Sequence, residues 1–261
     1  MAVAIPGLLA GAMIVAVPDL PDLTAWSAPC GEANPSAAVA KREGSFGAAA
    51  SVDLSLACGE LVVTTGPGSA WQFAGSDGQG GGAVVSDAAD RLSIRSTDRQ
   101  RTFAALALGD AWRLSLPTGT ALDVAAVISA GKATLDLTGA RLGTLRLDVN
   151  AGDASLDLDG ATLSRLALTV NAAKATVRLP ATGDLTANLG VNAGSLLVCA
   201  PADLGLRIQG GSSLATTTYV GLVRSADAWE SPAYATAMFH ADVTVSANVG
   251  SVVVNPEGGC L

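Results

Sequence analysis

Apolar and polar residues alternate through the middle of the chain, and the alternation is organised in units of 21 residues. Each unit begins at a short corner of small residues, and these corners recur without insertion: Ser129-Ala130-Gly131, Asn150-Ala151-Gly152, Asn171-Ala172-Ala173 and Asn192-Ala193-Gly194. Apolar residues occupy every second position on both sides of a corner, which is the period of a β-strand. Each unit is therefore predicted to hold two strands joined by a glycine-containing turn such as residues 138–141.

Two arrangements of such strands fit the pattern. In a β-solenoid each unit is one coil and equivalent residues stack on the next coil, whereas in an antiparallel meander they lie two strands apart. Charge favours the solenoid, because Lys132, Asp153 and Lys174 alternate in sign at equivalent positions and Asp157 precedes Arg178. Each exposed pair stabilises by only about 0.2 to 1 kcal/mol, so such pairs select a register rather than hold the fold together.

Looser copies of the corner extend the repeat beyond its strict part. They occur at residues 57–59, 209–211 and 248–250, each between alternating apolar residues. The sequence thus predicts an all-β, single-domain β-solenoid of the β-helix type over residues 45–255, followed by a tail at 256–261.

Two stretches interrupt the alternation. Residues 75–82 are rich in glycine and are expected to form a loop. Residues 215–240 hold Trp229, Tyr234 and Phe239. Because the end coil of a solenoid must cover its apolar interior, these aromatic residues are predicted to form a cap, with a partner surface as the alternative.

The corners place like residues in columns. Asn150, Asn171 and Asn192 are predicted to form a structural ladder, because stacked amides donate and accept along the stack, and a ligand-binding role is the alternative. Gly131, Gly152 and Gly194 follow at the same corners. None of the three Asn residues is followed by x-Ser or x-Thr, which excludes N-glycosylation there.

The chain opens with an uncharged apolar segment, residues 1–17. Its length is at the lower limit for a membrane-spanning helix, so an anchor, or the end of a truncated transmembrane helix, is the favoured interpretation. A cleaved signal peptide and a buried core strand are the alternatives. Residues 18–44 resemble a linker, and no Lys or Arg precedes Lys41. The β domain is therefore expected on the non-cytoplasmic side of a bacterial cell membrane.

Charge and cysteine content exclude several classes of protein. The formal net charge is −8, and the 15 basic residues are dispersed among 23 acids, which argues against a nucleic-acid partner. The four cysteines are Cys30, Cys58, Cys199 and Cys260, and none forms a CxxC pair, so a zinc site is not expected. Cys30 and Cys260 flank the predicted domain and are candidates for a bridge between its ends.

The sequence predicts no catalytic, cofactor or metal site. His240 is the only histidine, which removes histidine-based triads and most transition-metal sites. Asp136 and Asp157 occupy one column and resemble the paired carboxylates of a glycosidase, but the column continues with Arg178 and Cys199. No calcium-binding repeat is present either. The protein is therefore expected not to be an enzyme.

Three segments together resemble a known family: SVDLSLACGELVV near the start of the domain, LDVNAGDASLDLDGA in the repeat, and a Trp229-to-Tyr234 stretch followed by DVTVSANVGSVVV. They are similar to the toastrack, or putative-adhesin, domain of LiaF-like bacterial membrane proteins, over most of residues 45–255. The resemblance implies membrane helices ahead of a β domain and a role in envelope-stress signalling. It implies no catalytic residues.

The favoured function is a membrane-tethered envelope sensor or scaffold, with an envelope protein such as a sensor kinase as its partner. A surface adhesin, or a structural component that self-associates, is the alternative. A polymerising filament protein ranks below both, because residues 215–240 are expected to cap one end of the solenoid.

Overall fold

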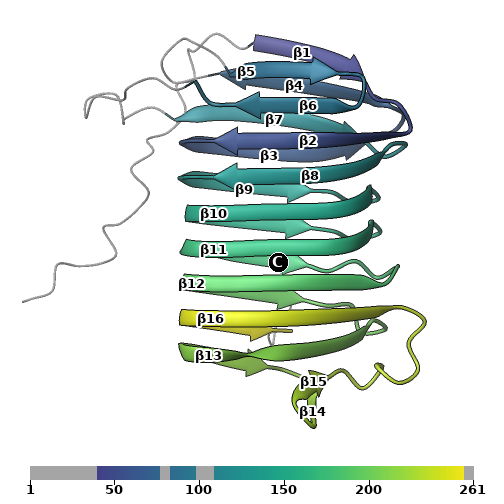
Figure 1. Ribbon diagram of the computed structural model, residues 1–261, viewed down its shortest axis with the longest axis vertical. Coiled ribbons are helices and arrows are strands. Elements are labelled where there is room, and N and C mark those ends of the chain that lie inside the picture. The colour runs from purple at the N-terminus through teal and green to yellow at the C-terminus, as the bar shows by residue number, and fades with distance from the viewer. Residues whose placement is uncertain (1–39, 77–82, 98–108, 256–261) are drawn as a thin grey trace, which may run out of the picture.

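The computed structural model describes residues 40–76, 83–97 and 109–255, and within these ranges it contains strands and turns but no helix (Figure 1). Sixteen strands form one sheet. In chain order they are β1 (Ala40–Ser45), β2 (Ala49–Leu56), β3 (Gly59–Gly66), β4 (Ala70–Ser76), β5 (Val84–Ala88), β6 (Arg91–Arg95), β7 (Asp110–Pro117), β8 (Ala121–Ile128), β9 (Gly131–Asp136), β10 (Arg141–Asp157), β11 (Thr162–Arg178), β12 (Leu185–Cys199), β13 (Gly205–Tyr219), β14 (Val223–Ser225), β15 (Ala228–Glu230) and β16 (His240–Val254).

The central strands pair in parallel with a register of 21 residues. Val149 of β10 lies opposite Val170 of β11, which lies opposite Val191 of β12. Past the corner the same spacing joins Gly131 to Gly152. Figure 1 shows these strands in two layers, one in front of the other. We call a front strand and the back strand that continues it one level of the stack. Parallel pairing excludes the antiparallel meander for these strands.

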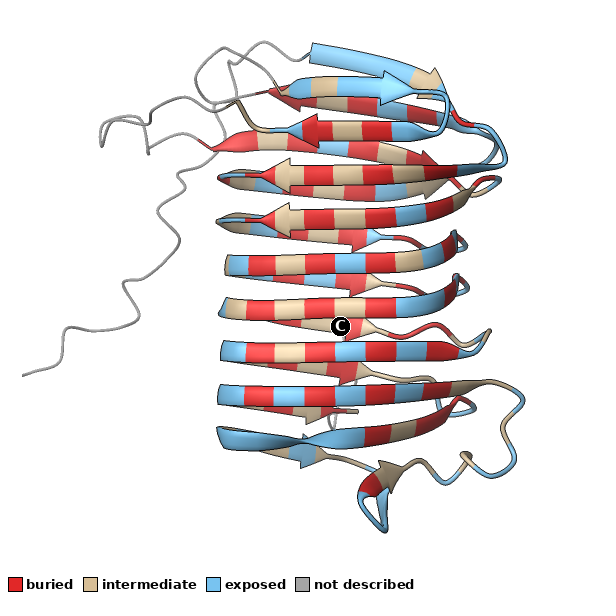
Figure 2. Ribbon diagram, in the orientation of Figure 1, coloured by how far each residue is buried: buried red, intermediate tan, exposed pale blue. Residues whose placement is uncertain are grey.

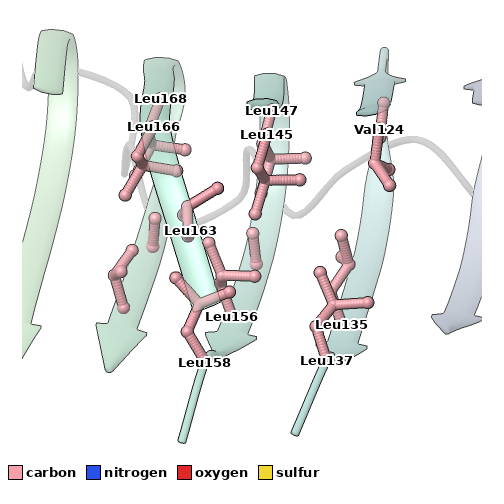
Figure 3. Packing of buried hydrophobic residues seen from close by; sticks show 14 of the residues in the cluster. Val124, Leu135, Leu137, Leu145, Leu147, Leu156, Leu158, Leu163, Leu166 and Leu168 are labelled. Atoms are coloured by element: carbon pink, nitrogen blue, oxygen red, sulfur yellow. The ribbon is translucent and has the colours of Figure 1, made fainter. Parts of the chain in front are cut away.

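The core lies between the two layers. Buried and outward residues alternate along the central strands at every level (Figure 2). Leu145 and Leu147 of β10 stack on equivalent leucines of β11, and Leu156 projects from the opposite layer into the same interior (Figure 3). Each fully buried leucine stabilises the fold by roughly 1.5 to 3 kcal/mol, so the apolar columns supply most of the stability.

Chain order is broken at the lower end of the stack. The last long strand, β16, lies between β12 and β13 and pairs in parallel with both. Val191 of β12 lies opposite Ala247 of β16, and Ala247 lies opposite Ser212 of β13. The penultimate level in space is therefore the last in sequence.

The upper end is broken in the same way. Strand β2 lies between β6 and β8, and β3 lies between β7 and β9. The early corner at residues 57–59 therefore stacks directly on the corner that begins the strict repeat, with Gly59 opposite Gly131. Beyond it the pairing turns antiparallel, because β4 runs against β7 and β1 runs against β4.

The upper end also moves the start of the β domain. Strand β1 begins at Ala40, inside the predicted linker at residues 18–44, because Ala40–Ser45 pairs with residues 70–75 of β4. Four aromatic residues fill this end, and all are at least 95% buried: Phe46, Trp71, Phe73 and Trp112. The rings of Phe73 and Trp112 meet edge to face at 5.9 Å. They fill the interior where the regular leucine columns end.

Two predicted interruptions differ in extent from the structure. Strand β13 continues to Tyr219, so the irregular segment begins at Val220 rather than at residue 215, because residues 215–219 still pair with β16. Gly75 and Ser76 belong to β4, and the rest of the predicted glycine loop lies outside the described residues. The apolar segment 1–17 and the tail 256–261 also lie outside them. In the described ranges there is no helix that meets the length and apolarity needed to cross a membrane.

Candidate functional site

A ladder of side-chain amides runs along the corner of the stack. Asn171 donates from Nδ2 to Oδ1 of Asn150 at 2.6 Å, and Asn192 donates in the same way to Asn171 at 2.6 Å. Asn248 continues the ladder with a bond of 2.9 Å to Asn192, and the hydroxyl of Ser213 lies 3.5 Å from Oδ1 of Asn248. Because each inner amide both donates and accepts along the stack, its hydrogen-bonding capacity is used structurally.

A glycine column accompanies the amide ladder. Gly131, Gly152 and Gly194 have φ angles of +122°, +112° and +144°, and the column continues to Gly59 at one end and Gly250 at the other. A Cβ on Gly152 would overlap the backbone carbonyl of Gly131 on the level above. These glycines are needed for the close approach of successive corners, which is a structural role.

The carboxylates that resemble a glycosidase pair are engaged in turns. Asp136 and Asp157 are register neighbours. Oδ1 of Asp136 accepts from the hydroxyl of Thr138 at 2.6 Å and from its N–H at 3.1 Å, and Oδ1 of Asp157 accepts from the N–H of Asp159 at 3.0 Å. Arg178 lies 3.2 Å from the second oxygen of Asp157. Both carboxylates thus hold the turns that end their strands.

The predicted aromatic cap covers part of the lower end. Trp229 pairs through its backbone with Ile208 of β13, and its ring lies 5.3 Å from that of Tyr219. Tyr234 meets His240 edge to face at 5.2 Å. Trp229 and Phe239 are partly buried against the apolar core. The cap therefore lies below one end of β13 rather than across the whole strand.

His240 is held within this cap. Its Nε2 lies 3.0 Å from the carbonyl oxygen of Tyr234, and its Nδ1 lies 4.0 Å from Oδ1 of Asp184. The backbone N–H of His240 donates to the same aspartate oxygen at 3.0 Å. These contacts anchor the start of β16. No group of three His, Cys, Asp or Glu side chains able to hold a metal ion occurs in the described ranges.

A cavity of about 620 Å³ lies beside the cap, at the end of the stack where β12 and β16 finish. Its lining is mostly apolar and includes Pro201, Leu206 and Leu222, with Arg178 and Ser231 as polar members. It contains no carboxylate or histidine among its described lining residues. Such a cavity offers no general acid or base to a bound molecule.

Two of the cysteines are disulfide-bonded, Cys58 and Cys199. The residues beside them, Gly59 and Gly194, are four strand spacings apart in the register, which is about 19 Å. Since Cα atoms joined by a disulfide lie within about 7 Å, Cys58 and Cys199 do not bond to each other. Their partners lie outside the described residues, as do Cys30 and Cys260. With four cysteines in the chain, this bonding leaves no bridge between Cys30 and Cys260.

Sequence reasoning missed two features of these surfaces. The fourth ladder residue, Asn248, had a signal, because the triplet at residues 248–250 matches the corner, but 248 does not follow from 192 by steps of 21. The aromatic cluster at the upper end had a weaker signal, because Trp71 and Trp112 lie far apart in the sequence. Parallel stacking of β3 on β7 brings their strands together.

Comparisons with known proteins agree with the fold. The chain is similar in structure to a protein described as a "putative cell adhesion protein" from Clostridium sporogenes, with a TM-score of 0.57 over 83% of this chain and 99% of that one. The two share a fold. Their sequences are 13% identical, so the likeness shows the architecture alone.

Two further structures are matched more loosely. They are described as putative adhesins from Bacteroides fragilis, at 11% identity, and Parabacteroides merdae, at 6%. Each match covers 84% of this chain and 98% of the other, with TM-scores of 0.29 and 0.28, so no argument rests on either. No protein-family model and no curated protein matches the chain.

Proposed function

We propose that residues 40–255 form a non-enzymatic β-solenoid of the toastrack type that is displayed on the outer side of a bacterial envelope and acts in adhesion. The observation that carries the proposal is the pair of broad outward faces on a stack whose amide ladder, glycine column and turn carboxylates are all engaged structurally. The shared fold with a protein described as a cell adhesion protein supports it.

The outward faces are suited to broad contact. Before the corner, the exposed positions hold residues such as Arg146, Arg165 and Asn188, and after it they hold Lys132, Asp153 and Lys174. A flat surface of mixed, mostly short polar side chains fits an extended partner such as a polymer or another protein better than a small molecule. The disulfide bonds of Cys58 and Cys199 support an oxidising location outside the cytoplasm.

Attachment of intact cells tests this proposal. Cells that display the full chain should attach to a surface or to neighbouring cells, and protease treatment of intact cells should remove both the domain and the attachment. A triple variant, Arg146→Ala, Arg165→Ala and Asn188→Ala, alters the face before the corner. Its matched control alters Lys132, Asp153 and Lys174 in the same way. Loss of attachment with one set alone identifies the binding face, whereas attachment unchanged by removal of the domain contradicts the proposal.

Envelope sensing is the second candidate function. It is supported by the uncharged apolar start at residues 1–17, by the absence of Lys and Arg before Lys41, and by the resemblance to LiaF-like proteins. In this function the apolar segment tethers the domain to the membrane and a sensor kinase is the partner. Capture of the full chain from membranes should then recover a histidine kinase, and capture with a variant lacking residues 40–255 should not.

A further inference from the structure

The lowest strand of the stack has one open edge. Strand β13 pairs with β16 along its whole length, but on its other side β15 contacts only Arg207 and Ile208. From Gln209 to Tyr219 no other described strand lies on that side. Figure 1 shows β14 and β15 below one end of β13 only.

The backbone of this edge presents unused hydrogen-bonding groups. The N–H of Val220 donates to the carbonyl of Val254 on β16. Successive residues of a parallel strand point their backbone groups to alternate sides, so Thr216 and Thr218 also face β16. The N–H and C=O groups of Ala215 and Thr217 therefore point to the open side, where another strand can pair with them.

The side chains of this edge are uncharged. No Asp, Glu, Lys or Arg occurs from Gln209 to Val223, although the chain as a whole has a net charge of −8. Leu214 is 82% exposed and lies opposite Val249 of β16, which is 50% exposed. At higher levels the same column holds alanine, as at Ala172 and Ala193. The lowest corner therefore exposes larger apolar side chains than the levels above it.

The opposite end of the stack is protected. There, β1 carries the exposed, charged residues Lys41, Arg42 and Glu43 next to its antiparallel partner β4. Charged side chains on an edge strand are a common defence against pairing with another chain. The two ends thus differ, and a head-to-tail contact would place the uncharged edge of β13 against the charged residues of β1.

We propose that the open edge of β13 pairs with the same edge of a second copy of this chain, about a two-fold axis, to give a closed dimer. Two-fold symmetry makes the two strands antiparallel. In every register within Gln209–Tyr219, uncharged residues face uncharged residues. With Thr216 at the axis, Leu214 lies opposite Thr218 of the second copy, and Thr216 lies opposite its own counterpart, a favourable cross-strand pair. This inference does not depend on what the outward faces bind.

Sedimentation velocity of the full chain tests the dimer. We expect a dimer whose dissociation constant rises at least about tenfold in Thr216→Lys and, separately, in Thr216→Glu, because like charges then meet at the axis. An equimolar mixture of the two variants should restore the dimer, since opposite charges then face each other. The matched control is Thr186→Lys on β12, an exposed threonine on an inner level, which should leave the dissociation constant unchanged.

Three results would overturn the proposal: a monomeric wild-type chain, growth into open-ended assemblies, or Thr216 variants that associate as tightly as the control. A monomeric wild type would leave the edge for a strand of another protein. Thermal unfolding followed by circular dichroism shows whether each variant is folded, which separates lost pairing from lost structure. Because cell attachment is measured separately, failure of the dimer and failure of the adhesion function are distinguishable.

Discussion

Asn248 donates a hydrogen bond from Nδ2 to Oδ1 of Asn192 across 2.9 Å, although 56 positions separate the two residues in the chain. The bond exists because β16 lies between β12 and β13 and brings a distant corner onto the ladder. Asn192 consequently donates to Asn171 and accepts from Asn248.

Loss of the Asn192 amide should weaken the lower part of the stack. In Asn192→Ala two hydrogen bonds are removed, and we expect the free energy of unfolding to fall by about 1 to 2 kcal/mol, measured by urea denaturation. Asn188→Ala is the control, because Asn188 is an exposed residue of the same strand and has no side-chain hydrogen bond to another described residue. It should change stability by less than about 0.5 kcal/mol. Equal effects of the two substitutions would mean that the ladder contributes nothing.

The glycine column should tolerate no Cβ. In Gly152→Ala the new methyl group meets the carbonyl of Gly131 in addition to the unfavourable φ of +112°, so we expect a loss of about 4 kcal/mol or more. Gly139 separates the two causes, because its φ is +69° but nothing lies within 4 Å of a Cβ built there. Gly139→Ala should cost only about 1 to 2 kcal/mol, the strain of the left-handed backbone alone. Similar losses at both sites would contradict the close approach of the corners.

Removal of one whole level should preserve the fold. Deletion of residues 150–170 joins Val149 to Asn171, which restores the sequence register because Val149 and Val170 are equivalent. We expect a folded β protein of lower stability, since the apolar contacts of one level are lost. Deletion of residues 150–169 leaves one residue too many, so the alternation after the junction would be inverted. That variant should not fold cooperatively, as judged by circular dichroism and urea denaturation.

The disulfide bonds should involve different partners. Peptide mapping under non-reducing conditions should find Cys58 and Cys199 in two separate bridges, each to one of the other two cysteines. The reason is the distance of about 19 Å between their neighbouring corner residues in the register. A peptide that joins Cys58 to Cys199, or alkylation of either thiol without reduction, would contradict this bonding.

Several elements of the fold could be predicted because their causes are local. The alternation around Leu147 and Leu156 indicates strands with one buried side, and the recurrence of Asn150 at Asn171 gives the spacing between equivalent residues. Carboxylates such as Asp157 also lie close in sequence to the turns that they hold, although sequence reasoning assigned them only to a solvated surface.

The sequence by itself determined the strand period, the spacing of 21 residues and which residues face inward, since these depend on neighbours along one chain. Only the tertiary structure decided that β16 would lie between β12 and β13 and that Asn248 would join Asn192. An open parallel edge accepts any strand with matching apolar columns, and its choice depends on which long-range pairing buries more surface and leaves fewer backbone groups unpaired. That comparison involves segments tens of residues apart, which no local pattern contains.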